Sequence, residues 1–330
     1  MIFVTGGTGF LGMHLLRALV IRGKPVRALK REKSKIPEDL FLPASIEWVE
    51  GNILDLPSLE EHMDGCEEVY HCAGMVSFQS KHRETLMKVN VEGTDNVVNV
   101  ALSKKIRKLV HVSSVSAIGR PLKAIDISEA TIWDSNGFNS NYGISKYLAE
   151  REVWRAMAEG LNAVIVNPTI IIGDGNWYEG SPRFFLNRWE GMRFYSSGTS
   201  GFVAAVDVAE LMIRLMNSEI QQERFIINAE DWSYRDLFFN IADAMGKKRP
   251  TVKASRWLTE MIWRLEALRS VFVAHPPLIS RETARISQLT YHFDTAKIKA
   301  AMGFTFTPIK KCIEDTAKIF LDDVASGKVK

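Results

Sequence analysis

Cysteine is scarce in this sequence of 330 residues, which holds three, Cys66, Cys72 and Cys312. The number is odd and the spacing matches no common metal-binding motif, which argues against a disulfide framework and against a cysteine-ligated metal. The pattern is typical of a reducing compartment. We therefore expect a cytoplasmic protein without a bound metal ion.

Charge of one sign and long apolar runs are also missing. Lys and Arg total 42, Asp and Glu total 39, and the net charge is +3. No block of about five like charges occurs, which argues against a nucleic-acid partner. No apolar stretch reaches the ~18 residues of a membrane span. Because a strand-like run begins at residues 1–4, we expect no cleaved leader.

The sequence does contain a regular alternation of short β-branched runs and longer helical patterns. Its content of 46% hydrophobic and 25% charged residues is ordinary for a soluble globular protein. Strands are expected at residues 2–5, 26–30, 46–50, 68–72, 108–113 and 163–166, and helices at residues 11–21, 84–102 and 145–159. Apolar strands separated by helices predict an α/β fold with a doubly wound parallel Rossmann sheet.

The rhythm changes after Pro168. Residues 174–200 are rich in Gly, Trp and Tyr, and from Ser233 onward the pattern is mostly helical, with a Trp-rich stretch at 257–273 and a final helix from Ile309. Two strands and a helix between these parts are expected at 202–206, 225–228 and 207–216. We expect a dinucleotide-binding domain of residues 1–169 plus 202–229, and a smaller, mostly helical substrate lid of residues 170–201 plus 230–330.

A glycine-rich loop follows the first expected strand, in the segment Thr5-Gly6-Gly7-Thr8-Gly9-Phe10-Leu11-Gly12. Glycine permits a tight turn, a close backbone approach to a pyrophosphate, and close contact between helix and strand. A helix that begins near Phe10 would point free N–H groups at the phosphates. A glycine turn without a ligand is the alternative. The strand–turn–helix context favours a cofactor site, formed by Thr5, Gly6, Gly9, Phe10, Leu11 and Gly12.

The spacing Gly-x-x-Gly-x-x-Gly differs from the Gly-x-Gly-x-x-Gly of the dehydrogenase fingerprint. The segment TGGTGFLG resembles the extended branch of the short-chain dehydrogenase/reductase superfamily, which includes the NAD-dependent epimerase/dehydratase family. The resemblance covers the whole first domain and, more loosely, the C-terminal part. It implies a nicotinamide dinucleotide cofactor and a small-molecule substrate, and it leaves a homodimer open.

The end of the second strand bears on the choice of dinucleotide. It reads Val26-Arg27-Ala28-Leu29-Lys30-Arg31, with no carboxylate before Glu32 to take the ribose 2′-hydroxyl of NAD. A guanidinium can instead bind a 2′-phosphate with two hydrogen bonds. The pattern resembles that of dihydroflavonol-reductase-like members, which use NADPH. We predict NADP, with Arg31 as the main 2′-phosphate ligand helped by Lys30 and Lys35. NAD stays the alternative cofactor, and solvated surface charge the alternative reading.

The same resemblance implies further cofactor contacts. Asn52 stands where the family has an acid that touches the adenine amino group, and its amide oxygen can also accept from that amine. Ile53 follows it. The segment Cys72-Ala73-Gly74 resembles the stretch beside the cofactor ribose, and Pro168 and Thr169 resemble the segment that flanks the nicotinamide. We expect Cys72 to be a small buried residue and not a reactive thiol.

Tyr142 and Lys146 form a Tyr-x-x-x-Lys pair, which places both side chains on one helix face. A phenol with a pKa of about 10 is a poor acid–base group at neutral pH. A lysine ammonium one turn away favours the phenolate, so the phenol can exchange a proton with a carbonyl or alcohol oxygen. A chance pair on a helix surface is the alternative. The glycine loop upstream favours the catalytic interpretation, in which both residues also contact the cofactor.

Two further residues complete the expected site. In the extended branch the catalytic hydroxyl stands five residues before a glycine, here Gly119, which selects Ser114 over the neighbouring Ser113. Its hydroxyl would hydrogen-bond the substrate oxygen. Asn90 matches the family's helix asparagine, which holds the backbone of the active site. Asp207 falls in a family turn that helps to fix the lid, and we interpret it first as a helix N-cap.

Several reactions use the same catalytic residues. Dehydratases carry an Asp-Glu pair beside the catalytic hydroxyl, and this chain has Val115 and Ser116 there. Epimerases commonly place an arginine and a histidine around the strand that aligns with residues 200–205, and both are missing here. Three arginines could substitute and keep a nucleotide-sugar epimerase as the alternative: Arg183, Arg188 and Arg193.

The expected lid is apolar. Aromatic residues gather near the mouth of the expected cleft, and a further apolar set follows helical spacing; these are Trp177, Tyr178, Phe184, Phe185, Trp189, Trp257, Leu258, Met261, Ile262, Trp263, Leu265, Leu268, Val271 and Phe272. A helix packed on the rest of the lid explains the second set equally well. Such walls suit an apolar ketone or the matching alcohol.

The late segments 293–298 and 302–304 resemble those of the dihydroflavonol-reductase and 3β-hydroxysteroid-dehydrogenase-like branch. We predict a ketone-reducing or alcohol-oxidising oxidoreductase. A non-catalytic NADP-sensing regulator is a further alternative, although such proteins usually lose the Tyr or the Lys.

Overall fold

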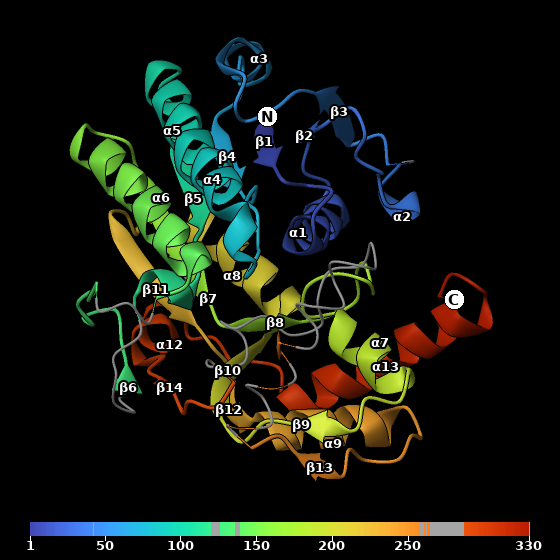
Figure 1. Ribbon diagram of the computed structural model, residues 1–330. Helices are drawn as coiled ribbons and strands as arrows, with labels where there is room; N and C mark the ends of the chain where they lie inside the picture. The colour runs from blue at the N-terminus through green and yellow to red at the C-terminus, as the bar shows by residue number, and fades with distance from the viewer. Residues whose placement is uncertain are drawn as a thin grey trace.

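A computed structural model describes residues 1–41, 43–119, 126–135, 139–255, 257, 261, 263–264 and 287–329. Seven parallel strands form its central sheet, in the order β11-β7-β5-β4-β1-β2-β3 (Figure 1). They are β1 (Ile2–Thr5), β2 (Val26–Lys30), β3 (Ile46–Glu50), β4 (Glu68–His71), β5 (Lys108–Val112), β7 (Ala163–Pro168) and β11 (Glu223–Ile227).

The register of the central strands positions the site. Thr5 at the end of β1 pairs with His71 of β4, which pairs with His111 of β5. The strand order reverses between β1 and β4, and ligands of doubly wound sheets bind outside the carboxyl ends of the strands at such a point.

Helices cover both faces of this sheet. The main helices are α1 (Phe10–Ile21), α3 (Leu56–His62), α5 (Gly93–Ser103), α6 (Asn141–Ala158), α8 (Ala205–Met216) and α12 (Ala296–Met302). Successive strand residues point to opposite faces, so Ile2 and Val4 pack in one core with α1 and α8. Phe3 points the other way and packs in a second core with Val98 of α5 and Val153 of α6.

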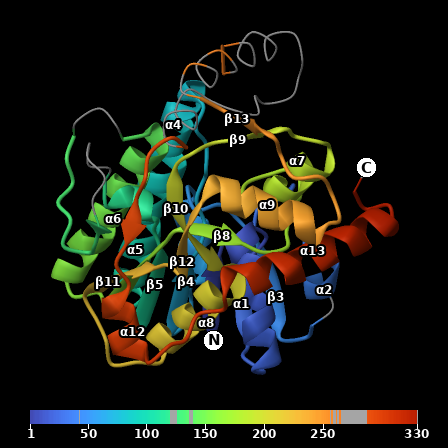
Figure 2. The same ribbon diagram turned by 90° about the horizontal axis from the view of Figure 1, so that it is seen from below.

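A smaller part gathers around a third core. Three strands form a sheet in the order β12-β10-β8, with bounds β8 (Ile170–Ile172), β10 (Thr199–Ala204) and β12 (Glu230–Ser233). Helices α7 (Arg183–Trp189), α9 (Tyr234–Ala244) and α13 (Ile309–Ala325) pack beside it through Phe185, Phe238 and Phe320. Figure 2 shows α9 and α13 side by side.

Short elements connect the parts. Two parallel strand pairs are β9 (Phe194–Tyr195) with β13 (Val252–Lys253), and β6 (Asp126–Ile127) with β14 (His292–Phe293). The remaining elements are α2 (Glu38–Phe41), α4 (Arg83–Leu86), the 3-10 turns η1 (Ser80–His82) and η3 (Val115–Ala117), and the π-helical turn η2 (Met87–Glu92). None of the helices in the described ranges is long and apolar enough to cross a bilayer.

The predicted α/β doubly wound sheet is confirmed, with a C-terminal part that is mostly helical. One strand differs from its prediction. The strand expected at 202–206 begins at Thr199 and pairs with β8 and β12, outside the central sheet. The chain leaves the central sheet after Pro168, the last residue of β7. The next strand, β8, then pairs with β10. The domain boundaries themselves stay a prediction.

The prediction that Asp207 caps its helix is wrong. Helix α8 follows Ala204, and the Asp207 carboxylate instead accepts hydrogen bonds from the backbone N–H of Thr307 at 2.7 Å and from its hydroxyl at 2.8 Å. Burial raises the pKa of this carboxyl, and the two Thr307 donors act against that rise. Asp207 therefore fastens the C-terminal segment to α8.

The predicted apolar helix in the 257–273 stretch falls mostly outside the description. The structure describes Trp257, Met261 and Trp263. Leu258, Ile262, Leu265, Leu268, Val271 and Phe272 lie outside the described residues.

Candidate active site

The glycine loop is built so that one of its glycines faces open space. Gly6 has a φ of +73°, and a Cβ there would lie 2.5 Å from Ala73 N; a Cβ on Gly12 would lie 2.1 Å from Gly6 O. These two glycines are required by the packing of the loop itself. Gly9 is exposed, and a Cβ there would meet only Gly6 O, at 3.2 Å, within the described structure. The open side of the loop is therefore at Gly9.

The start of α1 points toward that open side. Gly9 is its N-cap residue, no side chain caps the helix, and no acidic residue stands in its first turn. Unbonded N–H groups and the positive end of the helix dipole attract anions. The loop and the helix start therefore fit a diphosphate. Next to them, Leu11 is buried, and the ring centroids of Phe10 and His14 lie 5.6 Å apart.

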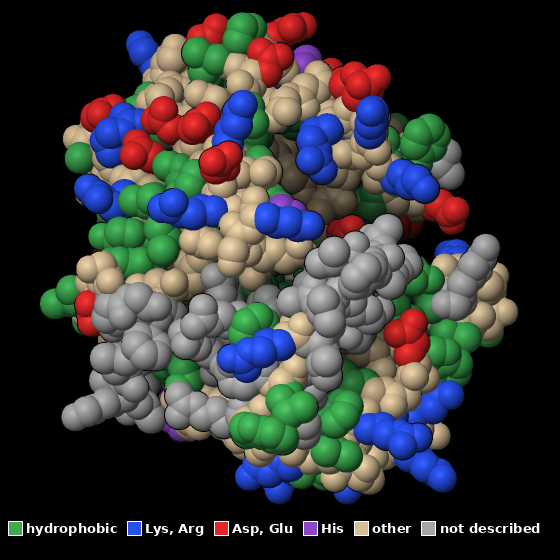
Figure 3. Space-filling view, in the orientation of Figure 1, with side chains coloured by type: hydrophobic (Ala, Val, Ile, Leu, Met, Phe, Trp, Pro, Cys, Tyr) green, Lys and Arg blue, Asp and Glu red, His purple; other side chains and the backbone are tan. Residues whose placement is uncertain are grey.

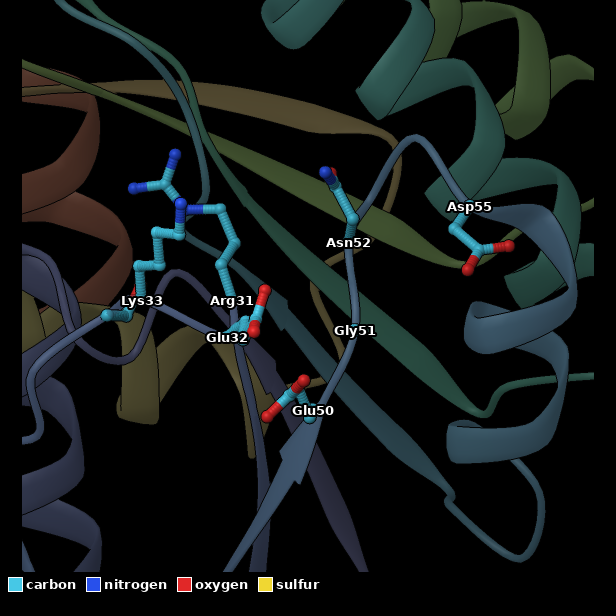
Figure 4. Close-up of a pocket in the computed structure, with 8 residues that line it drawn as sticks. Arg31, Glu32, Lys33, Glu50, Gly51, Asn52 and Asp55 are labelled. Atoms are coloured by element: carbon cyan, nitrogen blue, oxygen red, sulfur yellow. The ribbon is translucent and has the colours of Figure 1, made fainter.

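A cavity of about 560 Å³ lies at the far end of this site, beyond β2 and β3. Its lining residues are Arg31, Glu32, Lys33, Ser34, Glu50, Gly51, Asn52 and Asp55. Figure 4 shows Arg31 and Lys33 on one side and Asn52 and Asp55 on the other. Figure 3 shows Lys and Arg side chains around a hollow on the face seen in Figure 1.

The three predicted 2′-phosphate ligands differ in their positions relative to this cavity. Arg31 lines the cavity, whereas Lys30 Nζ lies 3.3 Å from the Glu50 carboxylate and Lys35 is not among the lining residues. Lys33, which is not among the predicted ligands, lines the cavity, because the chain turns after Arg31.

The two predicted adenine contacts have local partners. Asn52 Oδ1 already accepts from the N–H of Leu54 at 3.1 Å, so its carbonyl oxygen is used in a local turn. The Ile53 side chain is buried against Gly93, where a Cβ would lie 2.5 Å from Ile53 Cδ1. Its side chain therefore packs α5 against this segment.

The segment after β4 reaches helix α6, which carries Tyr142 and Lys146. Ala73 N donates to Thr5 Oγ1 at 3.3 Å, and a Cβ on Gly74 would lie 3.8 Å from Lys146 Nζ. Burial raises the pKa of the Cys72 thiol to about 12, partly offset by the Lys146 charge. Cys72 is half-buried and not fully buried as expected, and its thiol is protonated at neutral pH, which does not suit a nucleophile.

Helix α6 carries Tyr142 in its first turn and Lys146 one turn later. Ser140 begins the helix by accepting from the N–H of Gly143 at 2.9 Å. Tyr142 is half-buried, with its ring edge-on to Phe78 at 5.6 Å. Lys146 is 4% exposed and donates to the backbone oxygen of Val112 at 2.8 Å.

Lys146 is held in a buried position at the end of β5. Burial is the main cause that lowers its pKa to about 8, while the charge of Glu150 raises it. Because this pKa lies close to neutral pH, one neighbouring charge can change the fraction of Lys146 that is protonated.

The structure distinguishes the two candidate serines. The Ser113 hydroxyl is buried and donates to Glu150 Oε2 at 2.8 Å. Ser114 is half-buried and begins the turn η3, where its Oγ accepts from the N–H of Ser116 at 3.1 Å. The turn touches α6, since a Cβ on Gly143 would lie 3.0 Å from Ser116 O. Ser114 thus stands next to the first turn of α6, and its hydroxyl proton has no acceptor among the described residues.

Asn90 sits in the π-helical turn that interrupts the helix predicted at 84–102. Its Oδ1 accepts from the N–H of Met75 at 2.7 Å, and its Nδ2 donates to Met75 O and to Ser145 Oγ. Ser145 donates in turn to Tyr142 O at 2.8 Å. A π-turn often re-aims a side chain at a functional site. Here it links the segment after β4 to the catalytic helix.

Comparison with known proteins identifies the family of this chain. The family model described as the NAD dependent epimerase/dehydratase family matches residues 2–228. The chain belongs to this family.

Full-length relatives agree with that assignment. A protein of Synechocystis sp., provisionally named dihydroflavonol 4-reductase, is 30% identical over 96% of this chain and 94% of its own length. The sterol demethylase protein B of Methylococcus capsulatus is 28% identical over 96% of this chain and 97% of its own. The crystal structure of gox2253 superimposes with a TM-score of 0.83 and 28% identity, over 100% of this chain and 99% of the other. The chain is an enzyme of the extended short-chain dehydrogenase/reductase type and binds NAD(P).

Within this family member, two cofactor-segment residues predicted from the sequence have structural partners of their own. Thr169 is buried and its hydroxyl lies 3.0 Å from Asn228 Oδ1, so it holds β7 beside β11. Pro168 ends β7 and is buried. Asn167, just before them, donates to Ser114 O at 3.0 Å, and its Oδ1 is buried without a partner among the described residues.

A buried polar chain not marked by the sequence pattern runs beneath the site. Thr5 Oγ1 lies 2.7 Å from His71 Nδ1, and His71 Nε2 lies 3.0 Å from Thr94 Oγ1. The Thr94 hydroxyl donates to Asn90 O, so His71 Nε2 must carry the proton given to Thr94. Burial lowers the pKa of His71 to about 3, which keeps the ring neutral. These hydrogen bonds connect β1, the strand that precedes the glycine loop, to the turn that carries Asn90.

Glu150 is the second residue that the sequence pattern leaves unmarked, and it is 2% exposed. The signal that could have found it is spacing, because Tyr142, Lys146 and Glu150 recur every four residues and share one helix face. No group of three or more His, Cys, Asp or Glu side chains among the described residues is arranged to hold a metal ion.

Proposed function

We propose that this enzyme is an NADP(H)-dependent oxidoreductase that reduces a ketone, or oxidises the matching secondary alcohol, of a fairly apolar small molecule. The observation that supports the proposal is that Lys146 of α6 donates to Val112 O at the carboxyl end of β5, while the first turn of the same helix, which carries Tyr142, packs against the turn that begins at Ser114. This is the position at which doubly wound sheets bind their ligands.

The chain's own residues supply the proton chemistry. Ser114 donates a hydrogen bond to the substrate oxygen and stabilises the charge that develops there. Tyr142 gives its phenolic proton to that oxygen during reduction and takes it back during oxidation. Lys146, fixed on Val112 O, supplies the positive charge that makes the phenol a stronger acid. A bound nicotinamide supplies or accepts the hydride.

The preference for NADP is supported by the cavity beyond β2. Arg31 and Lys33 place two cationic side chains at its wall, where a 2′-phosphate can take charge-assisted hydrogen bonds. Glu50 is partly neutralised by Lys30. Glu32 also lines the cavity and could accept from the 2′-hydroxyl of NAD, so NAD stays the competing cofactor.

The substrate class is supported by the small part of the molecule. We propose that residues 170–201 plus 230–330 form the substrate lid over a dinucleotide domain of residues 1–169 plus 202–229. Phe194 and Trp257, in the first and second of these lid segments, are 38% and 71% exposed. Both full-length relatives named above match along the lid as well as the sheet.

A ketoreductase fits this site better than the other family reactions. Val115 and Ser116 after Ser114 carry no acid for the removal of water. Of the arginines that could hold a sugar diphosphate, Arg188 is buried and donates to Met192 O, whereas Arg193 is exposed. A nucleotide-sugar epimerase therefore stays the second candidate. Cytoplasmic location and a homodimer stay predictions.

A screen separates these functions. We expect NADPH oxidation with some apolar ketones and none with Tyr142→Phe under the same conditions. Interconversion of nucleotide sugars without net NADPH consumption would identify an epimerase. NADPH binding without turnover of any compound of either class would favour the non-catalytic regulator.

A further inference from the structure

Glu150 is buried in the core of the sheet–helix interface and yet accepts hydrogen bonds at both of its carboxylate oxygens. Oε2 accepts from Ser113 Oγ and from Asn167 Nδ2, both at 2.8 Å. Oε1 accepts from Arg224 Nη1 at 3.1 Å and from Trp154 Nε1 at 3.3 Å. Two donors per oxygen, one of them a guanidinium, favour the ionised carboxylate in a buried place.

The two contacts of Oε2 lie on either side of Ser114. Ser113 is the preceding residue, and Asn167 Nδ2 is shared between Glu150 and Ser114 O. Ser114 has extended backbone angles, φ −164° and ψ 152°, so consecutive side chains point in opposite directions. Holding the Ser113 hydroxyl inward therefore directs the Ser114 hydroxyl away from Glu150.

The same carboxylate acts on Lys146, one helical turn earlier. The titratable groups that face Lys146 from the sheet are His71, His111 and Cys72, and burial keeps all three neutral at physiological pH. On its own helix, Lys146 has Tyr142 one turn before it and Glu150 one turn after it. Glu150 is thus the anionic side chain, among the described residues, that favours the protonated lysine.

We propose that Glu150 is a positioning residue of this active site, which directs Ser114 toward the substrate and maintains the charge of Lys146 beneath Tyr142. Arg224 supports it from β11, where it pairs with Glu150 and also donates to the backbone oxygen of Glu129. This inference rests on the proposed oxidoreductase function.

Glu150→Gln tests the inference because it preserves size and removes the charge. We expect kcat at pH 7 to fall about ten- to hundredfold, since small displacements of a positioned group have effects of that size. KM for the cofactor should stay within about twofold, because the glycine loop and the Arg31 cavity are untouched. The pH at half-maximal alcohol oxidation should rise, because Lys146 loses its proton earlier and the phenol then ionises less readily.

Two matched variants separate charge from geometry. Glu152→Gln removes the same charge from α6 at the surface, where Glu152 pairs with Arg155, and should leave kcat and the pH profile unchanged. Glu150→Asp keeps the charge but shortens the reach, so kcat should fall while the pH profile stays near that of the wild type. Equal kcat and equal profiles for Glu150→Gln and the wild type would overturn the proposal.

A second readout needs no turnover. Ultraviolet difference titration, with Tyr142→Phe subtracted, follows the ionisation of the Tyr142 phenol, and its midpoint should rise in Glu150→Gln but not in Glu152→Gln. A failed substrate screen with this shift intact would refute the oxidoreductase function alone. If Glu150→Gln does not fold, Ser113→Ala replaces it: kcat must fall about tenfold with an unchanged cofactor KM, and full activity would contradict the inference.

Discussion

The two ends of the proposed cofactor site differ in how their charged groups are held. At the proposed catalytic end Lys146 is 4% exposed, donates to Val112 O, and is electrostatically coupled to His71 of β4 and His111 of β5, both kept neutral by burial. At the adenosine end Arg31 and Lys33 stand exposed around an open cavity. Low local dielectric strengthens interactions at the first end, whereas water and salt screen them at the second. Substitutions at the catalytic end should therefore have larger effects that depend less on salt.

The largest effect is expected from Tyr142→Phe. Loss of the phenolic proton should lower kcat by about 10²–10⁴-fold, the range of general acid–base catalysis, with NADPH affinity nearly intact. The control is Tyr147→Phe on the same helix, whose ring stacks on Trp133 at 4.1 Å and should keep that packing. Steady-state rates together with calorimetry check both. More than a tenth of the wild-type rate in Tyr142→Phe would remove this residue from the mechanism.

Gly9 lies between the two ends and should show a graded loss of cofactor binding. Its backbone, φ −86° and ψ 170°, suits any residue, and its Cβ position is open except for Gly6 O. Gly9→Val should therefore fold normally but place a branched side chain where the diphosphate would lie, so its affinity for NADPH should fall strongly. Gly9→Ala should lose less of this affinity. Unchanged affinity of the valine variant in calorimetry, with normal thermal unfolding, would mean that the loop is only a turn.

The same contrast explains which parts of the structure were predictable from the sequence. The central sheet was predictable because buried parallel strands must be apolar and alternate with helices. The placement of Tyr142 and Lys146 on one face of α6 was predictable because residues four apart in a helix share a face. That Lys33 and not Lys35 lines the cavity was not predictable, because it depends on how an exposed turn folds and leaves no periodic signal.

Long-range hydrogen bonds form the other group that the sequence did not disclose. Asp207 was interpreted as a local cap, but its donor is Thr307, one hundred residues away in the chain. Glu150 likewise takes its donors from three different strands or their ends and from its own helix. A local pattern identifies a residue that serves its own helix, and it does not report a partner that only the tertiary fold brings near.

The smallest effect is expected at the adenosine end, from Arg31→Ala. If Arg31 binds the 2′-phosphate, the lost charge-assisted hydrogen bond is worth roughly 1.5–3 kcal/mol, or about one to two decades of NADPH affinity. NADH affinity should change little, because NADH has no 2′-phosphate.

The matched control is Lys30→Ala, whose ammonium is paired with Glu50 and should contribute less. The difference between NADPH and NADH should shrink as ionic strength rises, because the contact is exposed. Calorimetry of wild type and both variants at two salt concentrations measures all of this. Equal wild-type affinity for the two cofactors would refute Arg31 as a 2′-phosphate ligand and would leave the basic residues from Lys30 to Lys35 as solvated surface charge.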